Sequence, residues 1–348
     1  MTADRTGTTR LLILLLATAV LATVAVVSVV RAADRADERS RARPGEPQAR
    51  PGTVSLLQPD RLLFRNLAWG PERDRIASVP LDAPAGARTA AGQDCLRFHA
   101  SAAGTGICLR RKGGVVPGHE AVVLDARLRP VRTFPVPGTP TRARVSPSGR
   151  LVAWTVFVSG DSYASGTFST RTAIHDTATG TLVPNLEALT VLVDGRRHRA
   201  TDHNFWGVTF AADDNRFYAT LATGGRTYLV EGDLRSRTVR TLRENAECPS
   251  LSPDGTRIAY KKRVPGLPAD APWRLHVLDL RTGTDTPLAE RASVDDQALW
   301  YDAHTLVYAL PGDFGADLWS VRADGVGRPR LLLKSATSPA VLATSSAS

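Results

Sequence analysis

The chain has 348 residues, 43% hydrophobic and 22% charged, which suffices for two average domains or for one large all-β domain. Its formal charge of +10 comes almost entirely from arginine, since only four lysines occur, and the arginines are scattered instead of forming blocks. We therefore expect no nucleic-acid partner, although an anionic lipid head group or cell-wall polymer stays open. Three cysteines are too few for a cysteine-rich scaffold or a cysteine-based zinc cluster, and we expect no cofactor.

A run of twenty uncharged, mostly aliphatic residues covers positions 11–30, after a short tail at 1–10. A helix rises about 1.5 Å per residue, so this run matches the roughly 30 Å hydrocarbon core of a bilayer. We predict a transmembrane signal anchor. A weak small-residue motif at Val30–Ala32 leaves cleavage and secretion open.

Two features disagree about the side of the membrane on which the rest of the chain lies. Arg5 and Arg10 precede the apolar run, whereas five arginines follow it between positions 31 and 43. The positive-inside rule alone would place the C-terminal region in the cytoplasm. A disulfide, predicted below, would require an oxidising compartment. We favour the extracytoplasmic side.

Residues 31–52 contain no aliphatic side chain larger than alanine, so we predict that they form a disordered linker. Its prolines should stiffen it. The linker leads to a folded region at 53–338, and we expect a flexible tail at 339–348.

The folded region alternates two motifs. The first is a strand–turn–strand hairpin, clearest at 251–260 (LSPDGTRIAY). There Pro253 fixes φ for a turn, Asp254 can bond its own backbone, and Gly255 accepts a positive φ. Related hairpins occur at 69–78, 145–154, 210–219 and 299–308.

The second motif ends a strand at a polar residue that a turn and another strand follow. Its six markers, Asp82, Asp125, Asp176, Asp233, Asp279 and Arg322, are spaced by 43, 51, 57, 46 and 43 residues. Short strands at this period predict propeller blades, and six markers predict six blades. Closing the ring covers sheet faces that each blade alone would expose. We expect a strand at 61–67, or its neighbour at 54–57, to pair with the last blade.

Three segments carry a family resemblance: SPSGRLVAW (146–154), SPDGTRIAY (252–260) and VLDLRTGTDTPL (277–288). They are similar to the WD40-like repeats of TolB-type six-bladed propellers, over roughly residues 54–335. The resemblance implies an all-β six-bladed propeller, here preceded by one transmembrane helix and a linker. It implies little about activity, because this architecture serves binding modules, peptidase propellers and lyases. TolB proteins carry an additional N-terminal α/β domain that has no counterpart in this sequence, so a role in the Tol machinery is not predicted.

Cys95 and Cys108 are equally distant from a hairpin turn centred between Ser101 and Ala102. We predict that they lie directly opposite each other and form a disulfide; two unbonded buried thiols are the alternative. Cys248 occupies the matching position three blades away, and we expect it to be an unpaired buried thiol.

The segments that lead into the innermost strands of a propeller converge at one mouth of its central channel. The ligand-binding residues predicted there are Arg65, Asn66, Arg142, Arg144, Asn204, Trp206, Glu247, Asp296 and Gln297. Mixed charge with one aromatic ring suits a polar ligand or a peptide segment. The alternative is that these groups only pair with each other.

No catalytic residue and no metal site is predicted. Ser162 lacks the strand–turn–helix context of a nucleophile elbow, and His198, Asp202 and His203 stand in a turn-rich insertion. We therefore predict a non-enzymatic, membrane-anchored, extracytoplasmic propeller that binds a protein or a cell-envelope ligand. A propeller hydrolase or lyase acting on a carbohydrate or peptide is the alternative.

Overall fold

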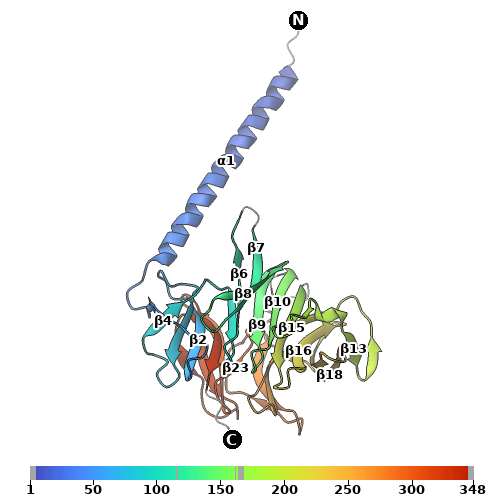
Figure 1. Cartoon of the computed structure of the whole chain (residues 1–348). Coiled ribbons are helices and arrows are strands. Elements are labelled where there is room, and N and C mark those ends of the chain that lie inside the picture. The colour runs from blue at the N-terminus through green and yellow to red at the C-terminus, as the bar shows by residue number, and fades with distance from the viewer. Residues whose placement is uncertain (1–4, 115–116, 161, 164–167, 344–348) are drawn as a thin grey trace.

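The structure is a computed structural model that describes residues 5–114, 117–160, 162–163 and 168–343. One long helix, α1 (Arg5–Ser40), leads into six β-sheets that surround a common axis (Figure 1). The innermost strands of neighbouring sheets contact each other in succession, and the last contacts the first. The predicted six-bladed propeller is confirmed.

The first three blades, with strands given from the axis outward, are as follows. Blade 1 consists of β27 (Ala336–Leu342), β2 (Arg61–Asn66), β3 (Ile76–Pro80) and β4 (Arg88–Ala91). Blade 2 consists of β5 (Arg97–Ala100), β6 (Gly106–Lys112), β7 (Gly118–Leu124) and β8 (Pro130–Val136). Blade 3 consists of β9 (Thr139–Val145), β10 (Leu151–Ser159), β11 (Ser169–Asp176) and β12 (Leu182–Val183).

The other three blades repeat this order. Blade 4 consists of β15 (Asn204–Phe210), β16 (Arg216–Thr223), β17 (Arg226–Asp233) and β18 (Thr238–Glu244). Two more strands, β13 (Thr190–Val193) and β14 (Arg196–His198), extend this sheet beyond β18, and the short 3-10 helix η1 (Leu186–Ala188) precedes them in the chain. Blade 5 consists of β19 (Glu247–Leu251), β20 (Arg257–Arg263), β21 (Trp273–Asp279) and β22 (Asp285–Pro287). Blade 6 consists of β23 (Leu299–Trp300), β24 (Thr305–Gly312), β25 (Gly315–Arg322) and β26 (Arg330–Leu333).

The ring closes inside blade 1, where the C-terminal strand β27 is innermost. It pairs antiparallel with β2, with Arg61 opposite Leu342 and Asn66 opposite Ala336. Closure through residues 61–67 thus occurs as predicted. The hairpin at 69–78 joins the second and third strands of its blade, because the innermost strand comes from the other end of the chain. One boundary differs from the sequence prediction. The tail begins later than residue 339, because β27 continues to the buried Leu342.

The linker is more ordered than its composition predicts. α1 continues to Ser40 instead of ending at residue 30, because a helix already nucleated by the apolar run propagates readily into polar residues. The i,i+4 pair Asp37–Arg41, at 3.4 Å, supports its end. Further on, β1 (Ala49–Pro51) pairs in parallel with the outer edge of β4.

The core lies between adjacent blades, where each sheet covers the face of its neighbour. Ile107 of blade 2 packs with Val152 and Trp154 of blade 3, and Leu275 of blade 5 packs with Leu306 of blade 6. All five side chains are buried. β-branched and aromatic residues at alternating strand positions favour this stacking of pleated faces.

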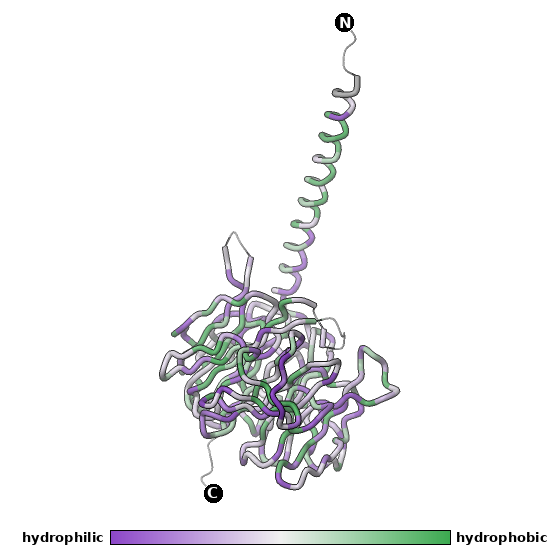
Figure 2. The backbone as a smooth tube through the Cα atoms, turned by 90° about the vertical axis from the view of Figure 1, so that its right-hand side faces the viewer, coloured by the Kyte–Doolittle hydropathy of each residue, from purple (hydrophilic) through white to green (hydrophobic). Residues whose placement is uncertain are grey.

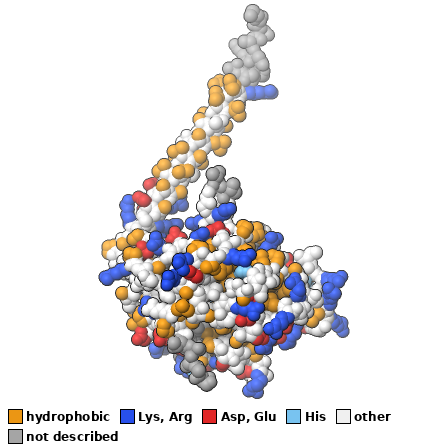
Figure 3. Space-filling model, viewed as in Figure 1, with side chains coloured by type: hydrophobic (Ala, Val, Ile, Leu, Met, Phe, Trp, Pro, Cys, Tyr) orange, Lys and Arg blue, Asp and Glu red, His pale blue; other side chains and the backbone are white. Residues whose placement is uncertain are grey.

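α1 stands away from the ring. Residues 9–40 are long and apolar enough to span a membrane, and none of this segment is buried. Figure 2 shows its continuous hydrophobic stretch, and Figure 3 shows charged side chains at the two ends of this stretch but not along it. The helix is therefore a candidate membrane anchor.

The end of α1 is fixed to one face of the ring, which we call the anchor face. The amide of Gly70, in the connection between β2 and β3, donates to the carbonyl of Arg39 at 2.9 Å. The guanidinium of Arg43 lies 3.8 Å from the ring centre of Trp69. β6 and β7 rise from the ring on this same side (Figure 1). Because strands alternate in direction, the innermost strands also begin at the anchor face, and the turn at 253–255 lies on the opposite face.

Candidate functional site

Four of the predicted mouth residues line one cavity at the axis. Its volume is about 30 Å³, and its walls are Arg97, Phe98, His99, Thr141, Arg142, Ala143, Arg144, Asp296, Gln297, Leu299, Ser338 and Pro339. A single water needs roughly 10–15 Å³ on this measure, so the cavity holds only two or three water-sized groups. Side chains therefore leave little free space at this level of the axis.

Asp296 joins blades 2, 3 and 6 at this cavity. It lies in the segment leading into β23 and contacts Arg97 at 2.8 Å and Arg142 at 3.4 Å. Burial opposes ionisation of Asp296, but the two guanidinium groups outweigh it and lower the pKa of this carboxyl to about 2. The carboxylate is thus an ionised structural partner at neutral pH.

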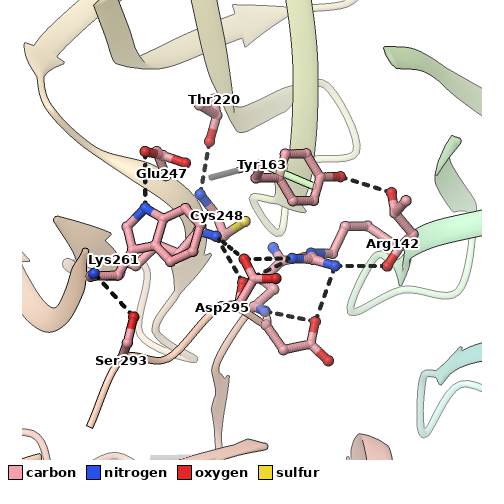
Figure 4. A network of polar contacts seen from close by, with 12 residues as sticks. Arg142, Tyr163, Thr220, Glu247, Cys248, Lys261, Ser293 and Asp295 are labelled. Carbon is pink, nitrogen blue, oxygen red and sulfur yellow. Dashed lines mark hydrogen bonds and ion pairs between the residues drawn. The ribbon is translucent and has the colours of Figure 1, made fainter. Parts of the chain in front are cut away.

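A second group of charged side chains includes Lys261, Asp295 and Glu247, which Figure 4 labels. Lys261 on β20 is fully buried, with Nζ 2.6 Å from Oδ1 of Asp295 and 3.6 Å from the ring centre of Trp273. Trp273 in turn donates its indole N–H to Glu247 at 3.0 Å, and Glu247 also pairs with Arg263 at 2.9 Å. Burial raises the pKa of Asp295, but Lys261 and Arg142 outweigh it, so that the pKa is lowered overall.

Tyr163 closes the channel from the connection between β10 and β11, a loop that the sequence gives no reason to place inside. Its ring is buried against Trp206 (5.1 Å between ring centres), and its hydroxyl lies 2.7 Å from that of Thr141. Arg142 lies 4.9 Å from the ring centre. Burial raises the pKa of the Tyr163 hydroxyl. The neighbouring residues 161 and 164–167 lie outside the described residues.

Several predicted mouth residues are buried or hydrogen-bonded to other protein groups instead of lining the cavity. Trp206 is 0% exposed, within a cluster that includes Cys248, so its ring offers no face to a ligand in this conformation. Asn204 accepts from the amide of Thr170 at 2.8 Å. Asn66 is also buried and donates to the carbonyl of Glu72 at 2.9 Å.

Arg65 and Gln297 connect neighbouring blades. Arg65 pairs with Asp74 at 2.6 Å and donates to the carbonyl of Leu96 at 2.9 Å, just ahead of β5. The side-chain amide of Gln297 donates to the carbonyls of Gly207 and Pro249 at 3.2 and 2.5 Å. It thereby ties the entry of blade 6 to the inner strands of blades 4 and 5.

Cys95 and Cys108 are bonded, with their Cα atoms 5.4 Å apart. They are not directly opposite each other as predicted, because Cys108 pairs with Phe98 and Cys95 precedes β5. The hairpin turn extends to Thr105, whose carbonyl accepts from the amide of Ser101. This longer turn moves the register by three residues. Cys248 is buried and unbonded.

A larger pocket lies beside this disulfide. Its volume is about 370 Å³, and it is lined by Asp74, Gln93, Asp94, Cys95, Leu96, Arg110, Arg111, Gly113 and Glu120. We call it the rim pocket. Arg110 pairs with Glu120 at 2.6 Å, whereas Arg111 is exposed. A pocket of this size with opposite charges fits a polar group several times larger than the channel cavity admits.

Sequence reasoning missed Arg97, His99, Tyr163 and Lys261. Lys261 carried a usable signal, since it shares a strand face with the buried Ala259 in RIAYKKR. Tyr163 carried none. Among the described residues, no group of three His, Cys, Asp or Glu side chains is placed to hold a metal ion.

No protein-family model and no curated protein sequence matches the chain. Among solved structures, TolB from Acinetobacter baumannii matches with a TM-score of 0.56 and 18% identity, over 82% of this chain and 67% of TolB. The chain has a TolB-like fold. A puromycin-hydrolyzing peptidase of Mycobacterium tuberculosis matches with a TM-score of 0.47 and 14% identity, over 82% of this chain and 44% of the peptidase. An oligogalacturonate lyase in complex with manganese also has a TM-score of 0.47, at 11% identity, over 76% of this chain and 73% of the lyase. At such identities the likeness of the TolB-like propeller to these proteins concerns the fold alone.

Proposed function

We propose that the protein is a membrane-anchored binding module whose propeller lies outside the cytoplasm and binds a protein or cell-envelope ligand at the channel mouth. The observation that carries the proposal is the shared position of the anchor, the mouth and the rim pocket on one face of the ring. The Cys95–Cys108 bond supports an oxidising compartment.

The helix limits where such a ligand is met. Residues 31–40 continue α1 beyond the apolar run and add about 15 Å between the bilayer and the ring. The anchor face is thus held close to the membrane surface. We infer that the ligand is a segment of another membrane protein or an envelope component presented near the bilayer.

The channel acids favour binding over catalysis. Asp296, Asp295 and Glu247 each face a guanidinium or ammonium group within 3 Å. A general acid or base needs a proton that it can exchange near the working pH, and these cations oppose protonation of Asp295 and Asp296. Groups exposed enough to touch a ligand include Arg97 and Asp295 at the mouth and Asp94 and Arg111 at the rim pocket.

Site-specific photocrosslinking of the full-length protein in the membranes of cells that produce it tests this proposal. A photoreactive residue replaces Arg111 on the anchor face or, as the matched control, Asp254 in the turn on the opposite face. We expect a discrete crosslinked product at position 111 only. Equal labelling at both positions, or labelling at position 254 alone, would refute binding at the anchor face.

A further inference from the structure

Arg144, at the axis, is a buried cation that forms no ion pair with an acidic residue in the described part of the chain, although Asp296 acts on it at longer range. It is 7% exposed, and its Nη2 donates to the carbonyl of Ala298 at 3.4 Å. Its Nε is buried without a hydrogen-bond partner in the described part of the chain. Burial lowers the pKa of Arg144 to about 10, so the group still carries its charge at neutral pH. A buried charge that no counter-charge meets is strongly unfavourable.

The hydrogen-bonding pattern of His99 shows that an acceptor is missing beside Arg144. The backbone amide of Val145 donates to Nδ1 of His99 at 3.1 Å, which leaves the ring proton on Nε2. Nη1 of Arg144 lies 3.1 Å from this Nε2. Both nitrogens are therefore donors that face each other, and neither can accept from the other. An acceptor that both can reach would resolve the conflict.

The charges around the cavity favour an anion as this acceptor. Its walls carry three guanidinium groups, Arg97, Arg142 and Arg144, but one carboxylate, Asp296. Asp296 is occupied by Arg97 and Arg142. His99 adds no compensation, because burial and the neighbouring Arg144 hold its pKa well below the usual value and keep it neutral. The walls therefore have an excess of two positive charges.

We propose that a small monovalent anion, of the size of chloride, occupies this cavity and accepts hydrogen bonds from Arg144 and from the Nε2–H of His99. The volume of about 30 Å³ admits a monatomic anion and excludes an organic anion such as gluconate. The anion supplies the missing acceptor and half of the missing charge. It also links β5 to β9, so it would hold blades 2 and 3 together at the axis. The inference does not depend on the proposed ligand.

Bromide provides the direct test, because it replaces chloride and scatters anomalously. Crystals of the detergent-solubilised full-length protein, grown in sodium bromide, should show an anomalous peak within hydrogen-bond distance of Arg144 and His99. Absence of a peak in this cavity overturns the proposal, whether or not bromide binds elsewhere. This measurement needs no variant and stands even where a substitution prevents folding.

Thermal unfolding in chloride and in gluconate, at equal sodium concentration, tests the role of Arg144. At ten times the dissociation constant, binding shifts the folding equilibrium about eleven-fold, which raises the midpoint by roughly 2 °C or more. We expect this rise in the wild-type protein and in Arg171→Met, an exposed arginine of β11, but not in Arg144→Met. A general salt effect would persist in Arg144→Met. Equal wild-type midpoints in the two salts would also contradict the proposal.

Discussion

The ion pair between Lys261 and Asp295 allows a quantitative test of the channel structure. In Asp295→Asn, Nζ of Lys261 keeps the carbonyl oxygen of residue 295 at 2.8 Å and the face of Trp273, but loses the carboxylate at 2.6 Å. The ammonium has 0% exposure, so water cannot replace the lost charge. The substitution therefore leaves an uncompensated buried cation.

The expected cost follows from the exposure of the two partners. Removing one partner of a fully buried pair costs about 3–5 kcal/mol, whereas an exposed pair contributes about 0–1 kcal/mol. Here the ammonium is buried but the carboxylate is 59% exposed. We expect Asp295→Asn to lower the free energy of unfolding by about 2–3 kcal/mol, between these limits. The double variant with Lys261→Met should recover most of this loss, because it removes the uncompensated charge as well.

Urea unfolding of the full-length protein in detergent micelles, followed by tryptophan fluorescence, measures these differences. Asp324→Asn is the control, because its pair with Arg322 is exposed on both sides and solvent screens it, so we expect no measurable loss of stability. The reasoning is refuted if Asp295→Asn costs no more than this control, or if the double variant is as unstable as Asp295→Asn.

Three further predictions concern the disulfide, the buried histidine and a glycine at the axis. Cys95 and Cys108 should resist alkylation in native material until they are reduced, whereas freely alkylated thiols would place the propeller in the cytoplasm. Because the disulfide closes a loop with a sequence separation of 13, replacing both cysteines by alanine should lower the free energy of unfolding in urea by about 3 kcal/mol. His99 stays neutral when folded, whereas in the unfolded chain it takes up a proton below its ordinary pKa of 6.5. Stability should therefore fall by roughly 1.4 kcal/mol per pH unit below this pH, and urea midpoints of His99→Gln should lack this part of the decline. Gly207 has φ +66°, and an added Cβ would lie 2.8 Å from the backbone of the next inner strand. Gly255 has a similar φ of +71°, but the space around it is open, so Gly207→Ala should be less stable than Gly255→Ala by roughly 2 kcal/mol. Equal melting temperatures of the two variants would contradict this.

The fold could be predicted because its signals are local. Turn residues such as Pro253 and Gly255 mark hairpins within a few positions, and their period counts the blades. The predicted strand register was wrong where the local turn signal was ambiguous. Between Cys95 and Cys108 the chain offers several turn positions, and the longer turn ending at Thr105 displaced the pairing by three residues. The prediction of disorder across residues 31–52 missed the helix for another reason, because the helicity of residues 31–40 comes from the apolar run before them.

The candidate site could be predicted only in part. Arg142 and Asp296 line the cavity, because the segments that enter the inner strands converge at the axis. Trp206 follows the same rule but is fully covered by Tyr163 and its neighbours. That covering depends on how a loop between other strands folds, which no local pattern shows.

Residue type and short-range spacing are enough to specify the apolar segment of the candidate anchor and the sixfold β repeat. Which charged side chains meet depends on how the blades pack in three dimensions. Arg97 and Asp296 are 199 residues apart, and ring closure brings them to 2.8 Å. The packing of blade 3 against blade 2 places Arg144 next to His99 instead of next to a carboxylate. Compensation of charge at the axis is a property of the closed ring, since each blade contributes only one part of it.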